Sequence, residues 1–302
     1  MRSFVSKVIQ FGLLFFGVIW LGLAFIALST NWTPRFELRH FGHRTHWGSS
    51  LERVAEFEKW SRTNSQAPKG LILGSSTAYR NINPHILSEQ THVNWFNYGS
   101  SNQSPQISYY LLEQALQQTK LDYVLLDIYG LVASNDGLES AFDLIYNSEL
   151  AATKKMDLLR HYSDVRLWLR FGYFYTKKIL PSNKHIVYDT TNGAYLKKGF
   201  VCTYQAALLT YPKNQKKSTI AEIEVLEDIV QLCKSKGVKL VINIAPSLDQ
   251  RYYAPKVLKK NWLIYNHEIN DPSWFYDTHH MTCDGANKYS QLIGEKLAQQ
   301  IQ

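Results

Sequence analysis

The sequence predicts a three-layer αβα protein of the α/β class, with a parallel sheet, an N-terminal transmembrane helix and a helical insertion. The first observation behind this is that short, wholly apolar segments alternate with segments in which apolar residues recur at helical spacing. Strands without a polar face are buried on both sides, which is typical of a parallel sheet covered by helices. The second observation is an uncharged apolar run near the N-terminus. The third is a basic, aromatic stretch that interrupts the alternation.

The composition is that of a folded protein. Of the 302 residues, 45% are apolar and 19% are charged, which excludes a mainly disordered chain. This length allows one sizeable core with an insertion, or two small domains. The three cysteines, Cys202, Cys233 and Cys283, are too few and too scattered to predict a disulfide framework. No CxxC pair is present to support a structural zinc site, and Cys233 is expected in the core.

Residues 1–30 are predicted to form a membrane anchor. Residues 8–28 are 21 residues without a charge, and a helix of that length spans ~31 Å, the thickness of a bilayer's hydrocarbon core. A signal peptide has a shorter apolar region, of ~7–15 residues. However, Ala27, Leu28 and Ser29 resemble a cleavage site, so removal of the segment stays an alternative.

The main domain is expected on the extracytoplasmic side, periplasmic or extracellular, of a single-pass membrane protein. Long domains that follow an anchor cross the membrane largely regardless of flanking charge, and only seven residues precede the apolar run. The basic residues that flank the run are nearly balanced: Arg2 and Lys7 precede it, and Arg35, Arg39 and Arg44 follow it.

A connector at residues 31–68 leads from the anchor into the main domain, residues 69–302. The connector is expected to end in a helix at about 50–62, where Ser49 and Glu52 have the spacing of a capping box. Strands are predicted at 70–73, 93–99, 122–129 and 238–246. A helix should open at Ser104 and Pro105, and a further helix should be capped by Thr219 and Glu222 and end at Gly237. A last helix carries Ala286, Tyr289, Ile293 and Leu297 at helical spacing.

The insertion, at about residues 135–217, carries the positive charge of the chain. The net charge is +8, yet residues 151–217 hold thirteen Lys and Arg against three Asp, which is +10 for that segment alone. The segment is either a solvated surface or a surface that faces phosphates, in anionic lipids or in an acidic polymer. A nucleic-acid partner is not expected, because no nucleic-acid-binding motif accompanies the charge.

Two short motifs bear residues suited to acyl transfer. Ser75 and Ser76 follow a predicted buried strand and Gly74, a position where a sharp turn can expose a hydroxyl at the edge of the sheet. Asp277 precedes His280 by three residues, so its carboxylate can accept the Nδ1 proton of that histidine and leave Nε2 to take a proton from serine. Each motif alone is also common in turns and helix caps. A metal site is not expected, because no further Cys or His cluster accompanies His279 and His280.

Together these motifs resemble the SGNH (GDSL-like) hydrolase superfamily, from about residue 69 to the end without the insertion. LILGSSTAYRNINP resembles block I, FNYGSSNQSP resembles block II, and DTHHMTCDGANKYSQLI resembles the terminal DxxH block. The resemblance implies a flavodoxin-like sheet and a Ser-His-Asp triad of Ser76, His280 and Asp277. It also implies no cofactor.

The resemblance further implies an oxyanion site at block II. The backbone N–H groups of Ser76 and Asn102 would hold the oxyanion, with Gly99 and Ser75 beside them, while the side chains of Ser75 and His279 should point away from the reaction. Two positions depart from the family pattern: Asn102 stands where block II has glycine, and Leu131 stands near the block III asparagine. Loss of one oxyanion donor typically costs about 10²–10³ in rate.

The predicted function is a membrane-anchored, extracytoplasmic serine esterase or O-acyltransferase. Its substrate would be a cell-envelope glycan, polymer or lipid. The anchor and insertion resemble the DltD-like and alginate O-acetyltransferase-like branch, which implies a multi-span membrane acyltransferase as partner. The alternative is a non-catalytic assembly or binding protein that holds an acidic envelope polymer or such a membrane partner. The departure at Leu131 favours the alternative, whereas the joint presence of the triad residues favours the enzyme.

Overall fold

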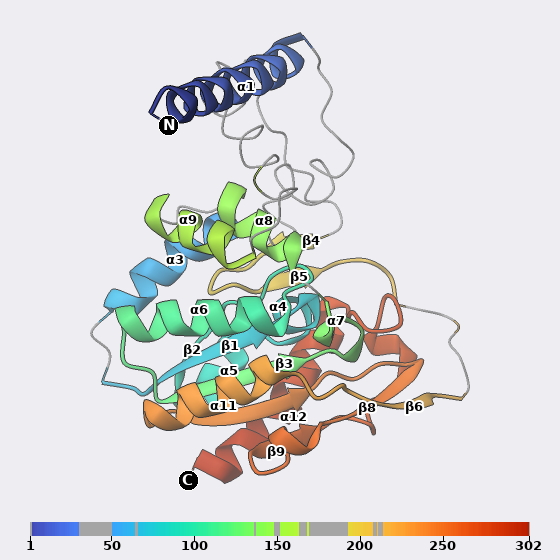
Figure 1. Cartoon of the computed structure of the whole chain (residues 1–302). Coiled ribbons are helices and arrows are strands. Elements are labelled where there is room, and N and C mark those ends of the chain that lie inside the picture. The colour runs from blue at the N-terminus through green and yellow to red at the C-terminus, as the bar shows by residue number, and fades with distance from the viewer. Residues whose placement is uncertain are drawn as a thin grey trace.

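A five-stranded parallel sheet forms the centre of the computed structural model, which describes residues 2–29, 50–63, 66–135, 137–147, 152–162, 168, 193–207, 210 and 214–301. The strands pair in the order β2-β1-β3-β7-β9 (Figure 1). They are β1 Lys69–Gly74, β2 Asn94–Asn97, β3 Tyr123–Ile128, β7 Lys239–Ile244 and β9 Trp262–Tyr265. The order reverses between β1 and β3, and sites in such sheets form at the carboxyl ends of the strands at this switch point.

Helices cover both faces of the sheet, which confirms the predicted three-layer αβα class. Alternate strand residues enter two separate apolar clusters: Leu71 and Leu73 of β1 lie in one, and Ile72 lies in the other. The first cluster is closed by α6 Pro105–Gln118 and α11 Glu224–Ser235. The second is closed by α4 Ser76–Asn81, α5 Pro84–Thr91 and α12 Cys283–Ile301.

Local capping sets where several helices begin. The Ser104 hydroxyl accepts from the Ile107 N–H at 3.4 Å, and Pro105 occupies the first turn of α6, as predicted. The predicted cap of α11 by Thr219 and Glu222 is wrong. The helix begins at Glu224, and Thr219 instead ends β6 Lys216–Thr219, which pairs in parallel with β8 Gln250–Tyr253.

Smaller elements lie outside the five-stranded sheet. Within the predicted insertion, the described residues form helices and also an antiparallel hairpin that the sequence did not predict. The turn of this hairpin contains Gly199 at φ +83, where an added Cβ would lie 1.6 Å from the Asn97 carbonyl oxygen. The elements are α3 Ser50–Arg62, α7 Gly130–Ala133, α8 Leu138–Asn147, α9 Ala152–Tyr162, β4 Gly193–Tyr195, β5 Val201–Thr203, and the short 3₁₀ turns η2 Lys256–Leu258 and η3 Pro272–Trp274.

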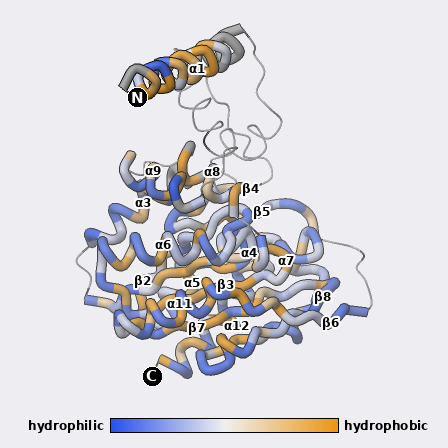
Figure 2. The backbone as a smooth tube through the Cα atoms, viewed as in Figure 1, coloured by the Kyte–Doolittle hydropathy of each residue, from blue (hydrophilic) through white to orange (hydrophobic). Residues whose placement is uncertain are grey.

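The N-terminal helix α1, Arg2–Ser29, is long and apolar enough to cross a membrane. Its apolar stretch Phe4–Gly22 has 19 residues, none of them buried, and Figure 2 shows the hydrophobic colour along this helix. Residues 30–49, which include the first half of the predicted connector, lie outside the described residues.

A disulfide joins Cys202 to Cys283 across 81 residues, whereas Cys233 is a free, buried thiol. The bond ties strand β5 of the hairpin to the first residue of α12. The scattered cysteines gave no hint of this pair, because the two residues are adjacent only in the folded chain. Structural disulfides persist in oxidising compartments such as the periplasm and the cell exterior.

The disulfide predicts a simple thiol count. Unfolded, unreduced protein should expose one titratable thiol, that of Cys233, and reduced protein should expose three. Replacing Cys202 with serine should lower the free energy of unfolding by about 2–4 kcal/mol, because the cross-link restricts the unfolded chain. A reductant should destabilise wild type but leave Cys202→Ser unchanged. Three thiols in unreduced protein would show that the bond does not form.

Candidate active site

Ser76 lies at the carboxyl edge of the sheet because β1 ends in a sharp turn. Gly74, the last residue of β1, has φ +150, and an added Cβ there would lie 2.6 Å from the Asp127 carbonyl oxygen. Glycine is therefore required at this position. Ser75 is the N-cap of α4, and Ser76 is its first residue, partly exposed beside the switch point between β1 and β3.

The structure brings the three predicted triad residues together. The Ser76 Oγ lies 2.7 Å from the His280 Nε2, and the His280 Nδ1 lies 2.7 Å from the Asp277 Oδ2. The other carboxylate oxygen of Asp277 accepts from the backbone N–H groups of His279 at 2.9 Å and His280 at 2.7 Å. These contacts fix the carboxylate and the imidazole in one orientation, as a Ser-His-Asp relay requires.

The protonation states suit a base. Burial works to raise the pKa of Asp277, but the hydrogen bond from His280 and the nearby imidazoles outweigh it, so the pKa lies well below its usual value and the carboxylate stays ionised. Burial lowers the pKa of His280, against the opposing effect of Asp277. His280 is therefore neutral near pH 7. We assign its proton to Nδ1, which faces Asp277, and this leaves Nε2 to accept from Ser76.

Asn81, at the end of α4, holds the loop that carries His280. Its amide Nδ2 donates to the His279 carbonyl at 2.8 Å, and its Oδ1 accepts from the Met281 N–H at 2.9 Å. This fully buried side chain therefore hydrogen-bonds the residues on both sides of His280 and connects them to α4, the helix that begins with Ser76. No local pattern in the sequence points to Asn81, because its role depends on contacts across 198 and 200 residues.

The two neighbours of the triad differ. Ser75 is buried, and its Oγ lies 3.1 Å from the Thr77 Oγ1, so it points away from the reaction as expected. His279 lies closer to the triad than Ser75 does, and its Nδ1 faces the Thr278 hydroxyl at 3.2 Å. Its ring stacks on Tyr129, with centroids 4.6 Å apart, and lies 4.0 Å from the His280 ring. Burial and the neighbouring imidazole of His280 lower the pKa of His279 to about 4.

A buried polar network supports the turn that presents Ser76. The Thr77 hydroxyl donates to Asp127 at 2.6 Å, and the Asn243 amide donates to the other oxygen of the same carboxylate. Burial raises the pKa of Asp127 to about 6, against these two hydrogen bonds. Tyr289 of α12 bonds Asn243, so the network joins α4, β3, β7 and α12. Sequence gave no signal for it, since each polar residue stands alone in an apolar segment.

The predicted oxyanion residues have mixed outcomes. Asn102 has φ +48, a left-handed conformation that glycine adopts freely and that asparagine tolerates better than most residues. Its side chain donates to Glu139, so only its backbone N–H is a candidate donor. The Gly99 N–H already donates to the Asn97 side chain at 3.1 Å. Leu131 lies in α7 and is 58% exposed.

The same residues are also candidates for binding a metal ion. Asp277, His279 and His280 offer ligand atoms within 4.8 Å of one another. However, the carboxylate and imidazole atoms of Asp277 and His280 already bond one another, Ser76 and the backbone. The contacts fit a triad better than a metal centre.

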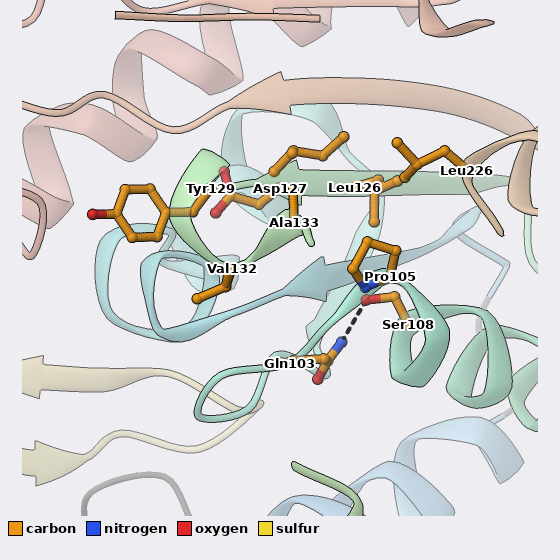
Figure 3. A pocket seen from close by; sticks show the side chains of 10 residues that line it. Gln103, Pro105, Ser108, Leu126, Asp127, Tyr129, Val132, Ala133 and Leu226 are labelled. Atoms are coloured by element: carbon orange, nitrogen blue, oxygen red, sulfur yellow. Dashed lines mark hydrogen bonds between the residues drawn. The ribbon is translucent and has the colours of Figure 1, made fainter. Parts of the chain in front are cut away.

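A pocket near the site lies between the end of β3 and the starts of α6 and α7 (Figure 3). It is lined mainly by apolar side chains, and the Gln103 amide donates to the Ser108 hydroxyl at 3.1 Å on its wall. None of the triad residues lines it. Tyr129 lines the pocket and also stacks on His279, so it connects the pocket to the site.

Comparison with known proteins gives a distant likeness. No protein-family model matches the sequence, and no curated protein matches it. Among solved structures, the chain is similar to a protein from Bacteroides fragilis described as a "putative acylhydrolase", with a TM-score of 0.40 and 10% identity. The match covers 84% of this chain and 98% of that one. A likeness this distant carries no conclusion about the reaction.

The site predicts the titration of its two histidines. By NMR, His279 should titrate near pH 4, and His280 below its ordinary pKa of 6.5. Replacing Asp277 with asparagine should lower the pKa of His280 further, because it removes the carboxylate that favours the imidazolium. A pKa of His280 above 6.5 in wild type would contradict the buried, neutral base.

Proposed function

We propose that this protein is a serine esterase or O-acyltransferase that acts on an acyl ester of a cell-envelope glycan, polymer or lipid. The observation that carries the proposal is the continuous hydrogen-bonded series Ser76, His280 and Asp277 at the carboxyl edge of the sheet. In this series the Ser76 hydroxyl is the nucleophile and the His280 imidazole is the base. The ionised Asp277 carboxylate orients the imidazole, and the contacting atoms lie at hydrogen-bond distance.

The chemistry follows the two steps of acyl transfer. The Ser76 Oγ attacks the acyl carbonyl carbon while the His280 Nε2 accepts the hydroxyl proton, and the carbonyl oxygen becomes an oxyanion near the backbone N–H groups of Ser76 and Asn102. Collapse of this intermediate expels the alcohol, which takes the proton from His280, and leaves an acyl-serine. Water or an acceptor hydroxyl then gives its proton to His280 and attacks the acyl group. Collapse of this second intermediate breaks the bond to the Ser76 Oγ, which takes the proton back from His280, and releases the acid or the new ester.

We further propose that α1 anchors the domain and that the domain is extracytoplasmic. The helix has the length and apolarity to cross a membrane, and the disulfide between Cys202 and Cys283 suits an oxidising compartment. Both features agree with a substrate in the cell envelope. A multi-span membrane acyltransferase as donor partner belongs to the same proposal.

A second candidate is a non-catalytic assembly or binding protein for an acidic envelope polymer or a membrane partner. Leu131 favours it, because an exposed leucine stands where a side-chain oxyanion donor is expected. The basic segment at residues 151–217 would supply the binding surface, although much of it lies outside the described residues.

The enzyme proposal predicts that Ser76→Ala and His280→Ala each remove nearly all turnover of an activated ester such as p-nitrophenyl acetate. The double variant should be scarcely worse than either single one, because members of a triad act as a unit. Asp277→Asn should cost less. A fluorophosphonate probe should label wild type at Ser76, which mass spectrometry of the labelled peptide identifies.

Two controls sharpen this test. Ser235→Ala, at an exposed position in α11, should keep full activity. Ser75→Ala should keep most activity and the label, since its hydroxyl faces Thr77. If Ser75→Ala were inactive and Ser76→Ala active, the nucleophile would be misassigned. If wild type neither turned over nor took the label, the binding-protein candidate would replace the enzyme.

The anchor predicts a fractionation result. Full-length protein should stay with membranes after high-salt and alkaline washes. A variant that begins near residue 31 should be soluble and folded, because it keeps α3, whose Val54 and Phe57 pack in the core. Release of full-length protein by the washes, or a mature N-terminus at Thr30, would show that the segment is not a retained anchor.

A further inference from the structure

His279 is held in one orientation beside the triad. Its backbone N–H donates to the Asp277 carboxylate at 2.9 Å, and its carbonyl accepts from the Asn81 amide at 2.8 Å. Its ring stacks on the Tyr129 ring, with centroids 4.6 Å apart and an interplanar angle of 15°. A side chain that is fixed in this way loses little conformational freedom when it binds a ligand.

The Nε2 atom of this imidazole is open to solvent. The other ring nitrogen, Nδ1, lies 3.2 Å from the Thr278 hydroxyl. The His279 side chain is 23% exposed, and within the described part of the chain no hydrogen bond reaches its accessible Nε2. This nitrogen can therefore bond a molecule that enters the site.

The two histidine rings direct Nε2 to the same side. Each presents Nδ1 to the Asp277 carboxylate, at 2.7 Å for His280 and 3.6 Å for His279. Because the two nitrogens of an imidazole face in different directions, both Nε2 atoms face away from that carboxylate. On His280 this atom lies 2.7 Å from the Ser76 hydroxyl, and the two histidine rings have their centroids 4.0 Å apart. The Nε2 of His279 therefore lies on the side where an ester must bind to react with Ser76.

The charge state of His279 favours a hydroxyl as its partner. Burial and the neighbouring imidazole of His280 keep the pKa of His279 at about 4, so the ring is uncharged at neutral pH. An uncharged imidazole has one donor and one acceptor nitrogen, and a hydroxyl bonds either, because it both donates and accepts. The His280 Nε2 gives its proton to the leaving alcohol, so a group that reaches the adjacent His279 ring belongs to the alcohol side of the ester.

We propose that His279 is a specificity-determining residue whose Nε2 hydrogen-bonds a second hydroxyl on the alcohol part of the ester, close to the scissile bond. The substrate class is then an ester of a polyhydroxylated alcohol, such as a glycan or a polyol, and not an ester of a simple alcohol. This inference rests on the proposed function and narrows it. It also gives a role to a polar side chain beside the base that the triad itself does not use.

Three acetate esters test the inference with the full-length protein. 2-Hydroxyethyl acetate carries the second hydroxyl, propyl acetate has a methyl group in its place, and 2-methoxyethyl acetate has an oxygen that accepts but does not donate. Release of acetic acid in a pH-stat gives kcat/KM for each ester. His279→Phe keeps an aromatic ring against Tyr129 but has no ring nitrogen. It should lower the hydroxyethyl-to-propyl ratio of kcat/KM by about 2- to 10-fold, the range for a neutral hydrogen bond.

The ratio separates recognition from a structural role, because a displaced His280 would slow the three esters alike. His279→Gln, whose amide can reach the position of Nε2, should keep part of the wild-type ratio. His92→Asn, at the exposed end of α5 with φ +55, should keep all of it, because asparagine tolerates this conformation. If His279→Phe does not fold, His279→Leu, which also lacks the ring nitrogens, gives the same comparison.

A hydroxyethyl-to-propyl ratio that His279→Phe leaves unchanged overturns the role of His279, and the proposed function stands. Absence of turnover with every ester, together with absence of probe labelling, overturns the proposed function, and the role of His279 falls with it. A lowered ratio supports the inference, and the methoxy ester then identifies the tautomer. If it reacts like the hydroxyethyl ester, Nε2 donates the hydrogen bond; if it reacts like the propyl ester, Nε2 accepts it.

Discussion

The hydrogen bond between Ser76 and His280 joins two segments that are 204 residues apart, and the arrangement of the site depends on keeping them together. A serine and an imidazole exchange a proton only at hydrogen-bond distance, so a small shift of either segment would uncouple them. Asn81 opposes such a shift, since its amide bonds the backbone on both sides of His280 from the helix that carries Ser76. The segment that carries His280 is therefore tied to the helix that carries Ser76 by two hydrogen bonds besides their own.

The sheet supplies the platform for this contact. Its order β2-β1-β3-β7-β9 brings the end of β1 beside the end of β3, and the site forms there. Asp127 and Asn243, at the ends of β3 and β7, are buried polar groups that an apolar core tolerates only because they bond each other, Thr77 and Tyr289. Through the bond between Thr77 and Asp127, the network ties the turn that presents Ser76 to the sheet and restricts its movement.

The sequence predicted those parts of the molecule that local pattern determines. The apolar strands, the cap at Ser104 and the two acyl-transfer motifs each depend on a few consecutive residues, and the fold class followed from them. Strand β9 and the hairpin were missed because they are short: β9 is an apolar run of only four residues, and the hairpin strands have three residues each. Asn81 and the cysteine pair were missed for another reason: their partners lie about 80 to 200 residues away. No periodicity within one segment reports such a contact.

The long separation between Ser76 and His280 has a consequence for the order in which the chain is made. A ribosome releases the N-terminus first, so the serine and its turn leave the tunnel long before the histidine does. His280 lies three residues ahead of α12, and its loop is held by Asn81 of α4 and adjoins Cys283, which the disulfide ties to β5. A nascent chain that has not yet reached His280 thus holds Ser76 without its imidazole partner. The hydrogen bond between the two forms only after both segments have been made.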